Sequence, residues 1–474
     1  MKDLKNNRII EAVIKTANET GIPVFLVGGA VRDYIRNDFN HNDLDFIVSD
    51  KLDLFVKRFS EKLKGKIIVW DENDRRVVFR ADGKNIHVDF ALCKGETIDD
   101  DLKFRDITIN AIAIDVNNIC ENFLDHLIDP LNGLEDIKNK KISICSGRAF
   151  TNDPVRILRV LRFAAKFGYR IDETTFYLMK DSASLINTVA VERVKKEFFS
   201  VLNYQNQKFS IVMMIEVGLI RSLLSEILEF KSIKQGSRHK YDLFNHSIQT
   251  VAMIERAEDV LLKQFDGNAD LFKPNLDELI EEGVTRRSLM IFAALLHDSG
   301  KTQTAKLKDN RITFYGHDKA GMDINRNLSK RAGLGKNAQN IVVDLTRNHM
   351  RLLHLSLLEE FTERAVKRFI FDTRNIFYEL LILSIADAMA TGDNADLDKL
   401  FRVTGEVLNI SKSLNDVNDI DPLLNGNDVM DIAGFNNTPM IGAILKELKS
   451  LECSGQIETR EDAIKWLKKR VNIN

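Results

Sequence analysis

Three aspartates on two stretches of alternating sequence are placed to hold divalent metal ions. Asp43 and Asp45 alternate with apolar residues in the segment 43–48. Successive side chains of a β-strand point to opposite faces, so both carboxylates share one face. The segment 86–90 alternates in the same way and supplies a third acid, Asp89. Carboxylates on one face can hold two divalent ions beside a triphosphate and activate a hydroxyl, so the pattern predicts phosphoryl transfer.

A glycine pair and an arginine precede these acids. Gly28 and Gly29 follow the apolar segment 24–27, and glycine lets the backbone approach phosphate oxygens at the start of a helix. Arg32 lies on the first turn of that predicted helix, where its guanidinium can hold the same oxygens. The alternative is that the glycines form only a turn, that Arg32 and Asp33 are a solvated pair, and that the acids line a loop. Each element alone favours this alternative, whereas the combination favours phosphoryl transfer.

A second helix is predicted after Asp153 and Pro154, with the acid at the N-cap and the proline at the first helical position. Apolar residues then fill one side of the helix, and basic residues form a stripe on the other side. Such a stripe suits RNA or nucleotide phosphates. The stripe consists of Arg156, Arg159, Arg162 and Lys166.

Length and charge are those of a multidomain enzyme that acts on RNA. The chain has 474 residues, enough for roughly three or four domains. Its net charge is only −2, but residues 148–240 hold 16 basic against 9 acidic residues. An acidic site followed by a basic segment suits a polyanion whose end must reach metal ions.

The cysteines and the N-terminus predict a cytoplasmic protein. The four cysteines are widely spaced and form no C-x-x-C motif, as expected for a reduced compartment. The N-terminus has no apolar signal region, and no apolar run approaches the length of a membrane span. We therefore expect neither secretion nor a membrane partner.

Histidines are concentrated downstream, six of the nine lying between residues 239 and 354. Several stand beside carboxylates or amides, as in the segment L-H-D-S-G-K at 296–301. Imidazoles and carboxylates from several helices can converge on one or two transition metals and activate water. The alternative is a helical module whose histidines only cap or pack.

Five segments, in one order, resemble the class II tRNA nucleotidyltransferase and bacterial poly(A) polymerase family, within the polymerase-beta-like superfamily. The likeness covers about half of the chain and owes its specificity to the combination of motifs. The segments are V-F-L-V-G-G-A-V-R-D with D-L-D (24–45), D-L-K-F-R-D-I-T-I-N-A (101–111), D-P-L-N-G-L-E-D-I (129–137), D-P-V-R-I-L-R-V-L-R-F (153–163) and A-V-E-R with Glu197 (190–197).

This sequence departs from the family pattern at a few positions. Phe104 stands where the family has the first of two arginines, and Ile107 stands where it has phenylalanine. Arg36 and Asn37 replace the usual Leu-Gly. The replacement at position 104 removes one phosphate or ribose contact but leaves the metal site intact.

The resemblance implies a role for each matching residue of the head. Asp43 and Asp45 would bind two Mg²⁺, and Asp89 would orient and deprotonate the 3′-hydroxyl of an RNA. Gly28, Gly29 and Arg32 would hold the triphosphate, while Arg105, Asp106 and Asn110 would support the ribose and the junction between head and neck.

The resemblance also implies how a base is chosen. Asp153 would accept from the exocyclic amine that cytosine and adenine share, and Arg156 would donate to their ring nitrogen or carbonyl. Uracil and guanine present a carbonyl in place of the amine and would be rejected. From the residues alone, a helix cap is the favoured interpretation of Asp153, and the family resemblance reverses that preference.

The downstream histidines resemble those of the HD phosphohydrolase domain that some members carry behind the body. By that likeness, four residues would be core metal ligands and two would complete a second metal site. Cyclic or terminal phosphates on RNA ends would be its natural substrates. The core ligands would be His246, His297, Asp298 and Asp387, and the second site would add His317 and His349.

The expected fold class is α+β. A polymerase-beta-like head with a mixed sheet and helices is followed by an all-helical neck and body, a helical HD domain and a helical tail, because the periodicity beyond Asp153 is helical almost throughout. The expected domains are 1–147 (head), 148–235 (neck and body), 236–400 (HD domain) and 401–474 (tail).

The predicted function is the addition of C and A residues to the 3′ end of tRNA from CTP and ATP, with Mg²⁺ in the head and a transition metal in the HD domain. An enzyme that adds only CC or only A, or a poly(A) polymerase, would share this fold. An HD phosphohydrolase with a nucleotide-sensing head and a non-catalytic RNA-binding protein are the alternatives from other classes. The three acids of the head argue against both.

Overall fold

The computed structural model divides the chain into two compact units. The N-terminal unit comprises Met1–Tyr204 and Val212–Ser222, and the C-terminal unit comprises Gln205–Ile211 and Leu223–Asn474. Each unit is described by itself. The structure describes residues 7–38, 43–63, 65–71, 76–81, 87–119, 122–236, 240–264, 275–309, 311–359, 361–392, 397–413, 422–434, 439–453 and 456–471.

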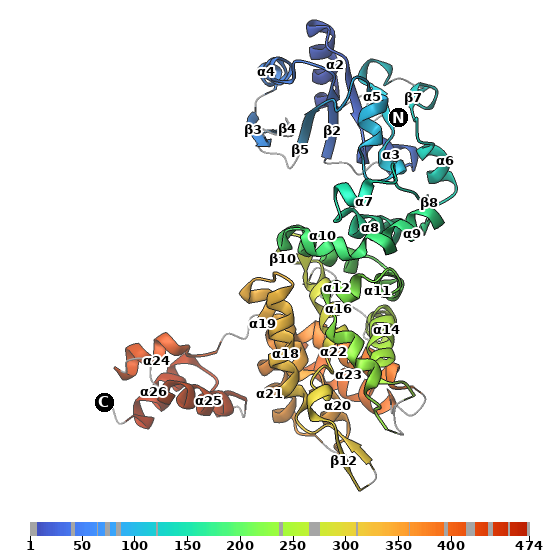
Figure 1. The fold of residues 1–474 in the computed structure, drawn as a ribbon. Coiled ribbons are helices and arrows are strands. Elements are labelled where there is room, and N and C mark those ends of the chain that lie inside the picture. The colour runs from blue at the N-terminus through green and yellow to red at the C-terminus, as the bar shows by residue number, and fades with distance from the viewer. Residues whose placement is uncertain are drawn as a thin grey trace. The chain divides into compact units, whose positions relative to one another are not determined.

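The N-terminal unit is built on a seven-stranded mixed sheet with the strand order β3-β4-β5-β2-β1-β6-β7 (Figure 1). Strands β2 and β5 run parallel, whereas every other neighbouring pair is antiparallel. The strands are β1 (Val24–Val27), β2 (Asp43–Val48), β3 (Gly65–Asp71), β4 (Arg76–Ala81), β5 (His87–Leu92), β6 (Ala113–Asp115) and β7 (Leu127–Ile128).

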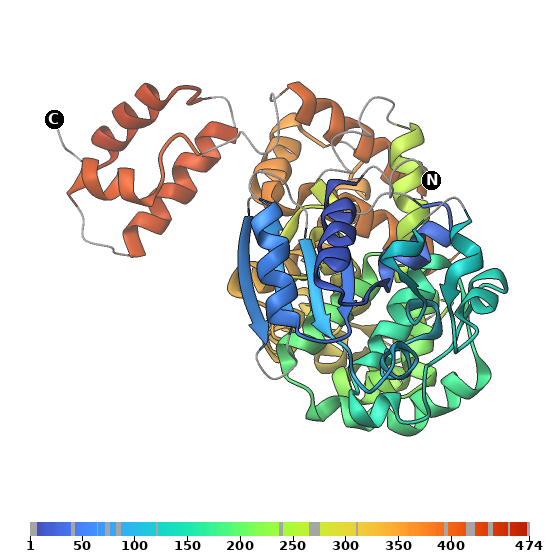
Figure 2. The same cartoon turned by 90° about the horizontal axis from the view of Figure 1, so that it is seen from above.

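Two helices, α2 (Arg8–Thr20) and α4 (Leu52–Lys62), pack together over one face of this sheet (Figure 2). Phe59 of α4 meets the ring of Phe90 on β5 with 4.9 Å between centroids, and Phe46 of β2 stacks on Phe90 at 5.4 Å. Because side chains alternate along a strand, these apolar residues bury one face and leave the alternating acids on the other.

Short elements lead from the sheet to a helical neck. They are α3 (Gly29–Ile35), α5 (Ile98–Lys103), η1 (Thr108–Asn110), η2 (Val116–Asn118), η3 (Phe123–His126), α6 (Gly133–Lys138), β8 (Lys141–Ile142), α7 (Ala149–Asn152), α8 (Arg156–Phe167), β9 (Arg170–Ile171), α9 (Glu173–Ser182), η4 (Ala183–Thr188) and α10 (Val191–Leu202). Helices α11 (Gln207–Glu216) and α12 (Leu219–Leu223) span the boundary between the units.

The expected start of the helix after Asp153 is wrong in detail. Helix α8 begins at Arg156, and its N-cap residue is Val155, which has no side-chain cap bond. Asp153 is extended and instead ends α7. Its carboxylate accepts from Arg193 at 2.8 Å, so it is engaged away from the helix end. The apolar side of α8 is confirmed, since Ile157, Leu158, Val160, Leu161 and Ala164 are buried.

The C-terminal unit is helical with two small hairpins. Helix α14 packs against α16 and α22, and α19 packs against α16 and α18. The elements are α13 (Glu226–Glu229), η5 (Phe230–Ser232), α14 (Leu243–Gln264), β10 (Leu279–Glu281), β11 (Val284–Thr285), α16 (Arg286–Leu296), α17 (Lys301–Thr304), β12 (Lys306–Lys308), β13 (Arg311–Thr313), α18 (His317–Arg331), α19 (Lys336–Asn348), α20 (Arg351–Ser356), α21 (Glu363–Thr373), η6 (Arg374–Ile376), α22 (Phe377–Thr391) and α23 (Leu397–Ser413).

The last three helices have a core of their own. They are α24 (Gly426–Ala433), α25 (Pro439–Cys453) and α26 (Arg460–Arg470), and Val429, Leu448 and Leu467 lie at their centre. A mixed-sheet head followed by a mostly helical remainder confirms the predicted α+β class, although β9 and the two hairpins interrupt segments that were expected to be all helical. Among the residues that the structure describes, no helix combines the length and apolar character that a membrane span requires.

Candidate active site and candidate metal centre

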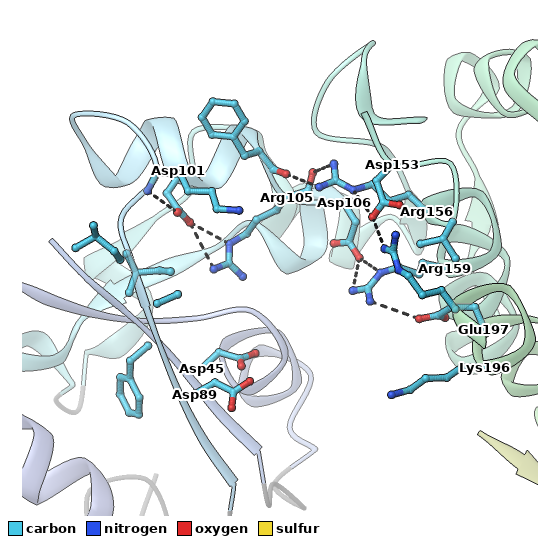
Figure 3. Close-up of a pocket in the computed structure, with 18 residues that line it drawn as sticks. Asp45, Asp89, Asp101, Arg105, Asp106, Asp153, Arg156, Arg159, Lys196 and Glu197 are labelled. Atoms are coloured by element: carbon cyan, nitrogen blue, oxygen red, sulfur yellow. Dashed lines mark hydrogen bonds and ion pairs between the residues drawn. The ribbon is translucent and has the colours of Figure 1, made fainter. Parts of the chain in front are cut away.

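Sheet register brings two of the three predicted acids together. Parallel pairing of β2 and β5 sets Asp45 directly beside Asp89, and paired residues of adjacent strands point to the same face. We call Asp45 and Asp89 the acid pair. Figure 3 shows their carboxylates side by side. Asp43 lies two residues earlier on β2, at the exposed end of the strand.

Gly28 keeps the space next to the acid pair open. It has φ +72°, a conformation that favours glycine. A Cβ atom there would lie 3.3 Å from Asp45 Oδ2 and 3.2 Å from Arg105 Nη1. The carboxylate oxygens beside this gap are the ligand type that Mg²⁺ prefers. The residues present therefore fit a divalent cation in the head.

The guanidinium of Arg32 bonds protein groups, whereas the sequence predicted that it would hold phosphate oxygens. Its side chain is buried and holds Asp33 through two bonds, at 2.6 and 2.7 Å, and it also donates to Asn110. The guanidinium lies 4.8 Å from the centre of the Phe167 ring. Arg32 and Asp33 thus form a pair, as in the alternative given for the sequence, but the pair is buried and not solvated. Through Asn110 and Phe167, Arg32 also links α3 to η1 and α8.

The acid pair lines a cleft of about 560 Å³ within the N-terminal unit (Figure 3). Acidic side chains gather on the sheet side, and a mixture of arginines, lysines and acids comes from the neck helices. The charged residues that line it are Asp45, Asp89, Lys94, Asp101, Arg105, Asp106, Asp153, Arg156, Arg159, Arg193, Lys196 and Glu197.

Asp106 is a buried anion at the junction between head and neck. Its carboxylate accepts from Arg159 Nε at 2.8 Å and from Asn110 Nδ2 at 3.2 Å. Burial alone would raise the pKa of Asp106, but the charge and hydrogen bonds of Arg159 outweigh burial and lower the pKa to about 2. Asp106 and Asn110 are therefore brought together as expected, with Asn110 also bound to Arg32.

The basic stripe on α8 is partly neutralised by an acid that we did not predict. Glu197 of α10 accepts from Arg162 Nε at 2.7 Å and lies 3.5 Å from Arg159 Nη1. Arg193, one turn earlier on α10, was also missed as a site residue, and it also lines the cleft. The spacing of Arg193 and Glu197 is the sequence signal that was available, because residues four apart share one helix face.

Arg193 and two main-chain carbonyls hold the predicted base-reading pair. Arg193 donates to Asp153 Oδ2, whereas Arg156 donates to the carbonyl oxygens of Phe104 at 2.8 Å and Arg105 at 3.2 Å. The departure at position 104 leaves this support intact, because the contact uses the backbone of Phe104 and not its side chain.

The predicted metal ligands of the C-terminal unit converge on one buried cluster, which we call the HD cluster. It consists of His246, His297, Asp298, His317, His349 and Asp387. Helices α14 and α22 carry His246 and Asp387, which lie 2.9 Å apart from Nε2 to Oδ1. The other four residues come from the end of α16, the start of α18 and the end of α19.

Backbone carbonyls orient three imidazoles of the HD cluster. Nδ1 of His297 donates to Ala294 at 2.8 Å, that of His317 to Phe314 at 2.9 Å, and that of His349 to Thr346 at 2.6 Å. A carbonyl accepts only, so Nδ1 carries a proton and Nε2 is turned to the cluster. Histidine metal ligands are commonly held in this way.

The donor atoms of His246, His297 and Asp387 lie within 4.8 Å of one another, and so do those of His297, Asp298 and His349. His297 Nε2 lies 3.2 Å from Asp298 Oδ2, yet by hydrogen-bond geometry it has no partner among the described residues. Burial alone would lower the pKa of His297, but Asp298 and Asp387 outweigh it and raise the pKa to about 10. Nitrogen and oxygen donors in this arrangement fit a transition metal.

Lys301 is a further charged group at the HD cluster. Its Nζ lies 2.5 Å from Asp298 Oδ2 and 2.6 Å from Gln235 Oε1. It belongs to the segment 296–301, which we noted only for its histidine and aspartate.

Three family models match successive parts of the chain. They are the poly A polymerase head domain at residues 24–143, a model described as the probable RNA and SrmB binding site of polymerase A at residues 168–231, and the HD domain at residues 243–392. The order of the three matches is the order that the sequence predicted.

Curated relatives resemble the chain over most of its length. An A-adding tRNA nucleotidyltransferase of Deinococcus radiodurans is 26% identical, covering 92% of this chain and 93% of the relative. A CC-adding tRNA nucleotidyltransferase of Geobacter sulfurreducens is also 26% identical, covering 97% and 94%. A multifunctional CCA protein of Teredinibacter turnerae is 29% identical, covering 69% and 74%.

Solved structures share the fold. The Thermotoga maritima CCA-adding enzyme complexed with tRNA has a TM-score of 0.58 at 21% identity, covering 98% of this chain and 95% of that one. A CCA-adding enzyme in complex with CTP has a TM-score of 0.60 at 22% identity, covering 98% and 94%. The three family models and the curated relatives show that the chain belongs to the family of tRNA nucleotidyltransferases and bacterial poly(A) polymerases that carry an HD domain.

Proposed function

We propose that this nucleotidyltransferase adds C and A residues to the 3′ end of tRNA, with CTP and ATP as donors, in the cytoplasm. The observation that carries the proposal is the acid pair, set side by side by strand register at one wall of a cleft whose other wall carries arginines. The names of the curated relatives, which add A, CC or CCA to tRNA, support the choice of acceptor and nucleotides.

The acids of the head bind and orient the reactants. Asp43, Asp45 and Asp89 would hold two Mg²⁺, which when bound supply charge neutralisation at the triphosphate and acidify the RNA hydroxyl. Asp89 orients the 3′-hydroxyl and takes its proton. The oxygen then forms a bond to the α-phosphorus, and pyrophosphate leaves in line. Backbone amides at Gly28 and Gly29 approach the phosphates.

Asp153 and Arg156 are proposed to select the base. The Asp153 carboxylate accepts from the exocyclic amine of cytosine or adenine, and the Arg156 guanidinium donates to the neighbouring ring nitrogen or carbonyl. Arg193, which donates to Asp153 at 2.8 Å, holds that carboxylate in its orientation. We further propose that Arg105, Arg159 and Arg162 contribute positive charge to nucleotide binding.

The test is an incorporation assay with tRNA that ends at the discriminator base. CTP and ATP together should give products longer by three nucleotides, whereas UTP and GTP should give none. Products that stop after CC, addition of a single A only to tRNA already ending in CC, or long A tails would reassign the enzyme within its family. No incorporation of any nucleotide, by protein that still binds tRNA, would contradict the proposal.

A second activity is proposed for the HD cluster, because its six ligands converge in a buried site that fits a transition metal. The class of reaction is hydrolysis of cyclic or terminal phosphates on RNA ends, which would free the hydroxyl that the head needs. RNA with a 2′,3′-cyclic phosphate should be opened by wild type and by Asp45→Asn, but not by His297→Ala. Equal rates for wild type and His297→Ala would contradict it.

A further inference from the structure

Asn325 is a fully buried amide in the middle of α18, and its side chain contacts three separate segments. Its Oδ1 accepts from Ser299 Oγ at 2.9 Å. Its Nδ2 group donates to the carbonyl of Leu296 at 3.0 Å and to Thr346 Oγ1 at 2.8 Å. Both amide donors and the amide acceptor are thus used, as a buried amide requires.

Each partner of Asn325 lies next to a ligand of the HD cluster. Leu296 directly precedes His297, and Ser299 directly follows Asp298. Thr346 provides the carbonyl that accepts from His349 Nδ1 at 2.6 Å. Helix α18 itself begins with His317. One side chain therefore joins all three segments that supply Asp298, His317 and His349.

A glycine contact brings α18 close enough for this network. A Cβ atom on Gly300 would lie 2.0 Å from the carbonyl oxygen of His317 and 2.5 Å from the backbone nitrogen of Gly321. Only glycine permits this approach between the turn after Asp298 and the first turns of α18. The contact sets the distance between the two segments, and the bonds of Asn325 set their rotation and register.

The other side of the HD cluster has different support. His246 and Asp387 stand on α14 and α22, which pack against each other along their length. The bonds given for Asn325 reach α16, its C-terminal turn and α19, and none of them reaches α14 or α22.

We propose that Asn325 is a positioning residue that fixes Asp298, His317 and His349 in place for one of the two metal ions of the HD cluster. The other ion, held by His246, His297 and Asp387, depends on it less: His297 follows Leu296, but the carbonyl of Ala294 orients its imidazole, and His246 and Asp387 stand on α14 and α22. The proposed role of Asn325 rests on the metal centre proposed for the HD cluster. Groups that orient metal ligands typically change affinity by about 10- to 100-fold when removed.

The test is Co²⁺ binding by full-length protein stripped of metal, measured by equilibrium dialysis and by the visible absorption of imidazole-bound Co²⁺. The variants are Asn325→Leu and Thr346→Val. In both, one Co²⁺ equivalent should weaken by about 10- to 100-fold, while the equivalent held by His246, His297 and Asp387 should keep its wild-type affinity. Thr346→Ser keeps the hydroxyl and should restore binding.

Thr404→Val is the matched control. Thr404 and Thr346 are both fully buried, and each donates from Oγ1 to the carbonyl four residues earlier, at 2.7 and 2.8 Å. Only Thr346 has an additional bond given to Asn325. A general loss of stability would affect both threonine variants alike, whereas a positioning role affects Co²⁺ binding only in Thr346→Val.

Three outcomes decide the matter. Selective loss of one Co²⁺ equivalent supports the proposal. Wild-type Co²⁺ binding by folded Thr346→Val and Asn325→Leu, or equal loss in Thr404→Val, overturns it while leaving the metal centre standing. Absence of Co²⁺ binding by the wild-type protein overturns the metal centre itself. If Asn325→Leu does not fold, the Thr346 variants still test whether this network positions the metal ligands.

Discussion

The head cleft and the HD cluster achieve convergence of charged groups in different ways. In the head, backbone pairing of β2 and β5 places the acid pair, and the cleft around it is lined by ion pairs. In the HD cluster, ligands from α14, α18 and α22 and from the residues that follow α16 and α19 meet through side-chain contacts in a buried interior. Backbone pairing therefore fixes the position of the acid pair, whereas the HD cluster depends on buried side-chain contacts.

Asp45→Asn should produce the largest effect and should separate the two sites. It removes one negative charge from the acid pair, and metal stabilisation of transition-state charge is worth several kcal/mol, or on the order of 10³-fold in rate. Single-turnover nucleotide addition should fall accordingly, with tRNA affinity and Co²⁺ binding by the HD cluster retained. Asp53→Asn, on the exposed side of α4, is the control; a normal rate for Asp45→Asn would contradict the assignment.

Removal of metal should destabilise the C-terminal unit and spare the sheet. A ligand at 100 times its Kd contributes about 2.7 kcal/mol to stability. Removal of the transition metal in buffer that keeps Mg²⁺ in excess should therefore reduce hydrogen-exchange protection in α14, α16, α18, α19 and α22, and leave β1, β2 and β5 unchanged. An equal loss of protection in the sheet, or no loss anywhere, would remove the contrast between the two sites.

Asp106→Asn should weaken the junction between head and neck. The pKa of Asp106 is lowered from 3.8 to about 2, and this difference is worth about 2 kcal/mol of unfolding free energy. Because the folded-state pKa is the lower one, this stability is fully present above pH 3.8 and is lost as pH falls toward about 2.

Urea unfolding of wild type and Asp106→Asn across this pH range measures the effect. The difference between the two proteins should be about 2 kcal/mol at neutral pH and should shrink as the pH falls. Asp181→Asn, at an exposed position of α9, provides the baseline. A constant difference at every pH would show that the charge of Asp106 does not matter.

Gly28→Ala should have the smallest effect on stability but a selective effect on the head. A left-handed backbone costs a non-glycine residue about 1–2 kcal/mol. Gly21→Ala is a matched control, because Gly21 has φ +68° and a Cβ atom added there would meet no atom within 4 Å. Both variants should lose stability, Gly28→Ala somewhat more because its ψ of −132° lies outside the left-handed helical region that Gly21 occupies at ψ 15°, and only Gly28→Ala should slow nucleotide addition. Equal activity of the two would show that the space beside Asp45 is not used.

The contrast explains which features the sequence could predict. Strand alternation is a local pattern, so the neighbours of Asp45 and Asp89 were enough to predict which face of each strand carries the acid. The parallel pairing of β2 and β5 then places the two acids side by side. The HD ligands were recognised by residue type and order, and the structure brings all six together.

Features set by a distant partner were missed. Arg32 was assigned to phosphate from its place on a helix, but Asp33 and Asn110 take its guanidinium. Asp153 was expected to cap α8, but Arg193, 40 residues away, takes its carboxylate. In both cases a partner from another segment, Asn110 or Arg193, binds a charged side chain, and local spacing does not reveal that partner; the bond from Arg32 to its neighbour Asp33 was the alternative that the sequence offered.

The most direct test of the central claim is the position of bound Mn²⁺ in the head. We would measure anomalous scattering from crystals of the protein with Mn²⁺ and an unreactive CTP analogue. The account predicts a Mn²⁺ ion in contact with both Asp45 and Asp89, next to the triphosphate. Nucleotide bound elsewhere, or Mn²⁺ that touches neither carboxylate, would contradict it.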